Sequence, residues 1–247
     1  MTYKALQIWF YAALSLALLS NPAWPAEKEG IRELAAKDAA LSYLRSLPHD
    51  GKIYVWPTWR RPYEVVADHL DVGGSIARYK VLRGDLNGLF PAIGTAQISI
   101  ISGDGANWQN DIKSALVRSA LLPSYKDFVA TAKVGQNGCT AYKFLSRDTW
   151  ASVGVILINE TVFREKGEAV LDGCVHAALD YLQGFPTTDR YFDYLTLPDA
   201  TIRGLVLEAI YKCAAEGEDG TSEPEERTRD GLTPLPSLDC IMTKVAE

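Results

Sequence analysis

The segment from Ala151 to Pro186 is the part of the chain that most restricts its fold. Val153–Ile158 is continuously apolar, which predicts a central strand covered on both faces. A helix is expected to follow over residues 165–183, either continuous or as two pieces broken near Gly173. Gly184 is the expected end of this helix, since glycine readily takes the conformation that closes a helix. The segment therefore predicts a strand inside a sheet, followed by a helix.

The rest of the chain predicts further helices and strands at helical or alternating spacing. Helices are expected over residues 28–47, 111–122 and 198–215, and strands over residues 52–56, 63–67, 95–102 and 139–145. The last of these strands is expected to form a hairpin with the central strand. Gly73-Gly74-Ser75 is expected to be a turn. Together these elements predict an α+β fold, with a small mixed sheet packed by three or four helices.

The N-terminus has the features of an export signal. Lys4 precedes an uncharged apolar run from Ala5 to Leu19, which is shorter than the roughly 20 residues of a spanning helix. Residues 1–26 are therefore expected to be a signal peptide, with cleavage after Ala23 or Ala26. The remaining chain is expected to have no membrane span and to be periplasmic or secreted.

The charge pattern divides the exported part into a globular domain, residues 27–215, and an acidic linker with a C-terminal tail, residues 216–247. Residues 216–230 carry seven acidic side chains against two arginines, and no large apolar side chain. Removal of the signal takes away Lys4 and shifts the net charge from −6 to −7. An acidic chain without a basic stripe is not expected to bind nucleic acid.

Four cysteines lie in the exported part, and an even number in an oxidising compartment predicts disulfides. Three pairings are open. Cys139 with Cys174 is preferred, because it would join the start of a strand to the helix that follows the central strand. Cys213 with Cys240 would then join the tail to the last helix. No C-x-x-C pair is present, which disfavours a thiolate metal site.

His176 and Asp180 are the candidate metal ligands, because they lie one turn apart on the helix of the opening segment. Zinc peptidases carry H-E-x-x-H in such a helix, with a glutamate that activates water. Here Ala177 takes the place of the glutamate, and Asp180 that of the second histidine. Glu208 on the next helix could supply a distant third ligand. The alternative is an ordinary pair of surface side chains, and no cofactor is expected, zinc being the only one considered.

A cluster of aromatic residues follows the same helix and is a candidate binding surface; its members are Tyr181, Tyr191, Phe192 and Tyr194. These rings could line a groove or form a small core beneath a loop. No nucleophile motif such as G-x-S-x-G and no phosphate-binding loop occurs in the chain.

The pattern Cys174-Val175-x-x-x-Leu179 followed by Gly184-x-Pro186 resembles a secreted proteobacterial family known as domain of unknown function 2927. The resemblance extends over residues 130–215, through Cys139, the apolar strand and Leu207–Tyr211. It implies a zincin-like arrangement. The family pattern has two glutamates where this chain has Ala177 and Ala178, and a glutamine at the position of Tyr181, which implies a divergent member whose activity is lost or altered.

Three hypotheses for function follow. The first is an exported, non-catalytic binding or envelope-associated protein on a degenerate peptidase-like scaffold, whose partner is an unknown protein or envelope component. The second is a metal-dependent hydrolase or peptidase that uses His176 and Asp180. The third is a structural secreted effector that uses the aromatic loop. The enzyme hypothesis is less favoured than the non-catalytic one.

Overall fold

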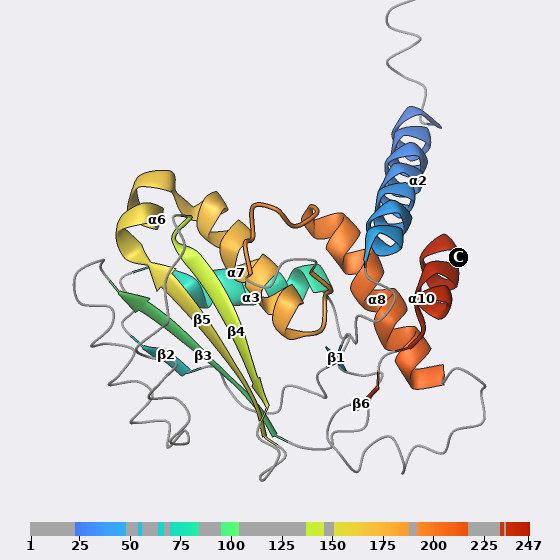
Figure 1. The fold of residues 1–247 in the computed structure, drawn as a ribbon. Coiled ribbons are helices and arrows are strands. Elements are labelled where there is room, and N and C mark those ends of the chain that lie inside the picture. Colours follow the sequence, from blue (N-terminus) through green and yellow to red (C-terminus); the bar gives the residue numbers. More distant parts are fainter. Residues whose placement is uncertain are drawn as a thin grey trace, which may run out of the picture.

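The computed structural model describes two packed parts, a sheet covered by helices and a separate group of helices (Figure 1). The described residues are 23–47, 54–55, 64–66, 70–83, 95–103, 137–145, 151–187, 192–216, 233–234 and 236–247. The helices are α2 (Ala23–Ser46), α3 (Val72–Arg83), α6 (Glu160–Lys166), α7 (Glu168–Leu182), α8 (Ala200–Glu216) and α10 (Leu238–Ala246). The predicted α+β class is confirmed.

The main sheet is mixed and has the strand order β2-β3-β5-β4. Its strands are β2 (Glu64–Val66), β3 (Thr95–Gly103), β4 (Cys139–Leu145) and β5 (Ala151–Asn159). β2, β3 and β5 are parallel, while β4 pairs with β5 in antiparallel register. The predicted hairpin is therefore confirmed. A second, two-stranded sheet pairs β1 (Tyr54–Val55) with β6 (Thr233–Pro234).

The central position of β5 explains its continuous apolar sequence. Ile156 and Ile158 face α7, and Val155 and Leu157 point to the opposite face of the sheet. All four side chains are buried. Because alternate residues of a strand point to opposite faces, a strand that is covered on both sides needs apolar residues at every position.

Two glycines and one asparagine set the ends of the helices that follow β5. The Asn159 side chain caps α6 by accepting a hydrogen bond from the Thr161 amide at 3.1 Å. Gly167, with φ at 88°, separates α6 from α7, so the predicted break near Gly173 is wrong and lies six residues earlier. Gly184, with φ at 114°, follows the end of α7 as predicted. A residue without a Cβ adopts such positive φ values with little strain.

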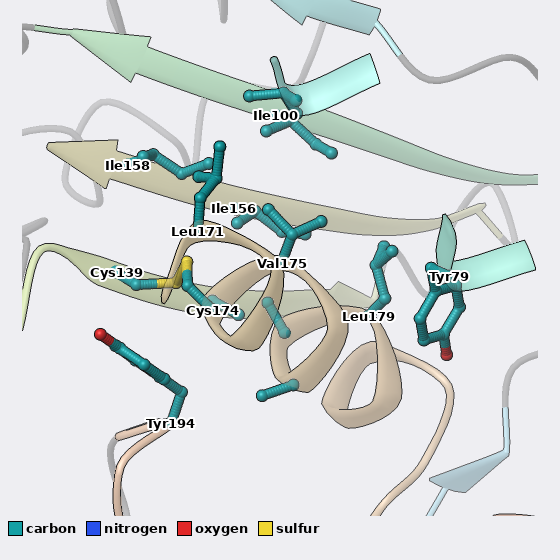
Figure 2. Close-up of a cluster of buried hydrophobic side chains, with 14 of the residues drawn as sticks. Tyr79, Ile100, Cys139, Ile156, Ile158, Leu171, Cys174, Val175, Leu179 and Tyr194 are labelled. Carbon is teal, nitrogen blue, oxygen red and sulfur yellow. A yellow bond between two sulfur atoms is a disulfide. The ribbon is translucent and has the colours of Figure 1, made fainter. Parts of the chain in front are cut away.

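Helix α7 covers the sheet with its apolar face (Figure 2). Leu171, Val175 and Leu179 point toward the isoleucines of β3 and β5. Helix α3 lies beside α7 and adds Val72, Ile76 and Tyr79 to the same core. Burying side chains of this size stabilises the fold by roughly 1.5–3 kcal/mol each, before the entropy cost of ordering them.

The second core lies between α2, α8 and α10, which contact one another. Its buried members come from all three helices and include Leu44, Val206, Ile210, Ile241 and Val245. Helix α10 lies inside the stretch that the sequence predicts to be an acidic linker and tail. Because α7 contacts α8, the two cores meet along the polar side of α7.

Both predicted disulfides are present, with the preferred pairing. Cys139–Cys174 joins β4 to α7, and Cys213–Cys240 joins α8 to α10. Figure 2 shows the first of them beneath the apolar face of α7. The described part of the chain has no free cysteine.

Two of the segments predicted from the sequence differ from the described elements or lie outside them. The turn predicted at Gly73-Gly74-Ser75 is wrong, because these residues lie in the first turn of α3. The helix predicted over residues 111–122 lies outside the described residues. In the described part, no helix is both long enough and apolar enough to cross a membrane.

Candidate functional site

The candidate site is the polar face of α7, where Asp172, His176 and Asp180 follow one another at intervals of one turn. Side chains four residues apart share one face of a helix. This face meets α3, and hydrogen bonds join all three residues to α3. We call this contact the α3–α7 seam; it comprises Ser75, Arg78, Tyr79, Arg83, Asp172, His176 and Asp180.

Asp180 lies at the inner end of the seam and is fully buried. Arg83 donates to both of its carboxylate oxygens, at 2.8 and 2.5 Å. Arg203, from α8, donates from Nε at 2.6 Å, and the Tyr79 hydroxyl donates at 2.8 Å. Two cations and a hydroxyl group therefore surround one carboxylate, at the point where α3, α7 and α8 meet. We call these four residues the Asp180 cluster.

The Asp180 cluster is sealed from solvent. The side chains of Arg83 and Arg203 are each 6% exposed. Burial raises the pKa of the Tyr79 hydroxyl well above its ordinary value, and the charge of Asp180 raises it further. Tyr79 therefore stays protonated and remains a donor to the carboxylate. A buried charge of this kind needs such partners, because removal from water costs several kcal/mol per ion.

The outer end of the seam is built around Asp172. Arg78 donates to both carboxylate oxygens of Asp172, at 2.7 and 2.8 Å, and the Ser75 hydroxyl donates to Oδ1. Burial alone would raise the pKa of Asp172, but these hydrogen bonds outweigh burial and the pKa is lowered. Arg78 is half-exposed and also contacts Glu168 at 2.7 Å. This end of the seam is a surface ion-pair network, and exposed pairs contribute little stability.

Ser75, His176 and Asp172 lie together, but they are not connected as a catalytic triad. In a triad the serine hydroxyl donates to the imidazole, and the imidazole donates to the carboxylate. Here the Ser75 hydroxyl donates directly to Asp172. The His176 Nε2 lies 2.9 Å from the backbone oxygen of Ser75. Because a carbonyl oxygen can only accept, Nε2 donates in this contact and cannot accept a proton from the hydroxyl.

The structure does not bring the three candidate metal ligands together. Glu208 is exposed on α8 and pairs with Lys212 at 2.7 Å, while Asp180 is enclosed by arginines. No group of three or more histidine, cysteine, aspartate or glutamate side chains in the described ranges could hold a metal ion. The guanidinium groups of Arg83 and Arg203 occupy the positions around Asp180 that a cation would need.

The aromatic residues that follow α7 are mostly part of the core. Phe192 and Tyr194 are each 7% exposed, and Phe192 packs on Tyr181 with ring centroids 5.2 Å apart. The Tyr194 hydroxyl donates to the Asn137 backbone oxygen at 3.3 Å. Tyr191 lies outside the described residues. The described aromatic residues therefore fit a small core better than a binding groove.

The arginines of the Asp180 cluster are the residues that sequence reasoning missed. A weak signal was present, because Asp180 interrupts the apolar sequence of α7 and Arg203 interrupts that of α8. A charge within an otherwise buried stretch is expected to have a buried partner of opposite sign. The sequence does not say which charges meet, since Arg83 and Asp180 are 97 residues apart.

A second buried carboxylate, Glu160, lies at the carboxyl end of β5. It accepts a hydrogen bond from the buried Ser102 hydroxyl at 2.8 Å and from Arg164 at 2.7 Å. Its two oxygens therefore join the end of β3, through Ser102, to the second turn of α6, through Arg164. The bonds make Glu160 a structural anchor of the α6 start.

Comparisons with protein-family models, curated proteins and solved structures find no match for this chain. The resemblance to domain of unknown function 2927, with its zincin-like arrangement, stays a prediction. The geometry of the α3–α7 seam is therefore the basis for the functional argument.

Proposed function

We propose that this chain is an exported, non-catalytic binding or envelope-associated protein on a degenerate peptidase-like scaffold. The observation that carries the proposal is the Asp180 cluster. In a metallopeptidase the polar face of such a helix faces substrate and metal. Here the same face is directed into the protein, where its carboxylates bind the arginines of α3 and α8.

The chemistry of the seam supports the same reading. A hydrolase needs a nucleophile, or a group that activates water, in reach of substrate. Ser75 is fully buried and donates to a carboxylate, and Ala177, which follows His176, cannot accept a proton. The residues along α7 therefore stabilise a contact between helices.

The disulfides support the exported compartment. Structural disulfides form and persist in the periplasm and outside the cell, and they are rare in reducing compartments. Both bonds connect separate elements, β4 with α7 and α8 with α10. They are compatible with a secreted or periplasmic protein.

Metal analysis tests the proposal. The purified full chain is incubated with zinc, dialysed, and its metal content measured by mass spectrometry, together with His176→Ala and the surface variant Glu208→Gln. We expect no stoichiometric zinc in any of the three. One zinc per chain that is lost in a folded His176→Ala would overturn the non-catalytic reading in favour of the metal hydrolase, and its loss in Glu208→Gln as well would add Glu208 to the ligands.

Cell fractionation tests the location. The full-length gene with a C-terminal tag is expressed in a Gram-negative host, and the protein is followed in cytoplasmic, periplasmic and membrane fractions. We expect a processed, disulfide-bonded chain outside the cytoplasm. A full-length chain with four free thiols in the cytoplasm would contradict export.

A further inference from the structure

The two disulfides differ in how easily a reductant can reach them. Cys139 and Cys174 are 2% and 0% exposed, and both belong to the core beneath α7. Cys213 is buried as well, but its partner Cys240 is only partly buried at the edge of the second core. Thiol–disulfide exchange requires direct access of a thiolate to one sulfur atom. Cys240 is the one of the four cysteines that is not buried, so it is the residue at which we expect a reductant to reach a sulfur atom.

The Cys213–Cys240 bond holds a short helix whose stability depends on packing. Helix α10 has nine residues, which is too few for a stable isolated helix. Its buried side chains, Ile241 and Val245, contact the second core formed with α2 and α8. The Ser237 side chain caps its start by accepting from the Cys240 amide at 3.3 Å. The disulfide thus adds a covalent link to this apolar contact.

Loss of the two disulfides should have different consequences. Cys139–Cys174 lies inside the sheet core, where β4 is also hydrogen-bonded along its whole length to β5 and α7 packs on the sheet. Without Cys213–Cys240, the contacts that the described residues give α10 include its two buried side chains, its partly buried apolar neighbours and the two-residue pairing of β6 with β1. Elements with few buried contacts open at low free energy while the rest of a protein stays folded.

We propose that Cys213–Cys240 is a reducible latch that holds α10 against α2 and α8. The reductant is a dithiol. Its thiolate attacks the Cys240 sulfur, the bond between the two cysteines breaks, and Cys213 leaves as a thiolate. The second thiol of the reductant then attacks the mixed disulfide and releases Cys240, so that two electrons pass from the dithiol to the protein and the dithiol becomes a disulfide. Release of α10 exposes the apolar surface of α2 and α8 that it covered.

Graded reduction of the native protein tests the latch. The full chain is treated with dithiothreitol without denaturant, and free thiols are trapped by alkylation at intervals and assigned by peptide mass spectrometry. We expect Cys213 and Cys240 to be alkylated at least about tenfold faster than Cys139 and Cys174, because the core pair is reached only by larger opening. Simultaneous alkylation of all four cysteines would overturn the proposal.

Hydrogen exchange then tests the motion. In the selectively reduced protein we expect faster amide exchange in Leu238–Ala246 and unchanged exchange in α7. The double variant Cys213→Ser/Cys240→Ser should show the same pattern without reductant. Unchanged protection of α10 after selective reduction would overturn the latch, whether or not the double variant folds.

Discussion

Replacement of Asp180 by asparagine removes the charge at the centre of the Asp180 cluster while keeping the shape of the side chain. Four hydrogen bonds reach the carboxylate, from Arg83, Arg203 and Tyr79. The side-chain amide in Asp180→Asn would keep one acceptor oxygen and would direct an N–H group toward a guanidinium group, which can only donate. Two arginine side chains, each 6% exposed, would then lose the counter-charge that the described residues give them.

The expected cost is large for a single substitution. Breaking a buried ion pair by removing one partner destabilises a protein by about 3–5 kcal/mol. For a chain of this size such a loss lowers Tm by about 6–20 °C. Urea unfolding followed by circular dichroism measures the change in unfolding free energy. An unchanged slope of free energy against urea concentration shows that the variant exposes the same surface on unfolding as wild type.

Asp172→Asn is the matched control, because it makes the same chemical change on the same face of α7. The side chain of Asp172 is 21% exposed and that of its partner Arg78 is 41% exposed, so water screens the pair. We expect a loss of about 0–1 kcal/mol. Equal and small losses in the two variants would refute the reasoning, since they would show that the Asp180 charge is not structurally important.

The remaining predictions concern the helices of the α3–α7 seam and the neighbouring helix α8. A Cβ at position 204 would lie 2.7 Å from the Arg83 Nη1, so Gly204→Ala should lower the unfolding free energy by about 1 kcal/mol or more. Nothing lies within 4 Å of a Cβ at position 173, so Gly173→Ala should raise the unfolding free energy by about 0.5–1 kcal/mol. Because the folded pKa of Tyr79 is raised above 10.0, its contribution is full below that pH and is lost as pH rises, so urea unfolding between about pH 8 and 11 should show a steeper alkaline loss in wild type than in Tyr79→Phe. The pKa of Asp172 is lowered below 3.8, so its contribution is present above that pH and is lost as pH falls through the folded pKa; in acid unfolding experiments the difference between wild type and Asp172→Asn should therefore shrink as pH falls below 3.8. A difference that does not shrink, a parallel alkaline profile, or a Gly204→Ala as stable as Gly173→Ala would contradict the corresponding statement.

The parts of the fold that were predicted correctly have strong local signals. The apolar run Val153–Ile158 predicts a strand buried on both faces, and β5 is that strand. The even number of cysteines predicted disulfides, and the positions of the cysteines favoured the pairing that is present. In each case, a few neighbouring residues carry the information.

Helix α3 was missed because its first turn contains two glycines, which usually indicate a turn. The Asp71 side chain accepts from the Gly74 amide at 2.9 Å, as a residue at the start of a helix does. A Cβ at Gly74 would lie 1.9 Å from the Asp71 Oδ2 in the present geometry. The glycine therefore allows the capping contact, and Asp71 was the signal that could have identified the helix.

Helix α10 was missed because the acidic composition that precedes it was extended to the end of the chain. Its own sequence contains Ser237 at the cap position and Ile241 and Val245 one turn apart. Those are ordinary helix signals. The role of Asp180 could not be predicted in the same way, since its partners Arg83 and Arg203 come from separate helices and meet only in the folded protein.

A double-mutant cycle between Asp180 and Arg203 tests the central claim most directly. The unfolding free energies of wild type, Asp180→Asn, Arg203→Met and the double variant are measured under the same conditions. Because the two side chains share a buried hydrogen bond of 2.6 Å, we predict that the double variant is more stable than the sum of the single losses implies, with a coupling of about 1–3 kcal/mol. Additive losses would contradict the account, since they would show that Asp180 does not join α7 to α8.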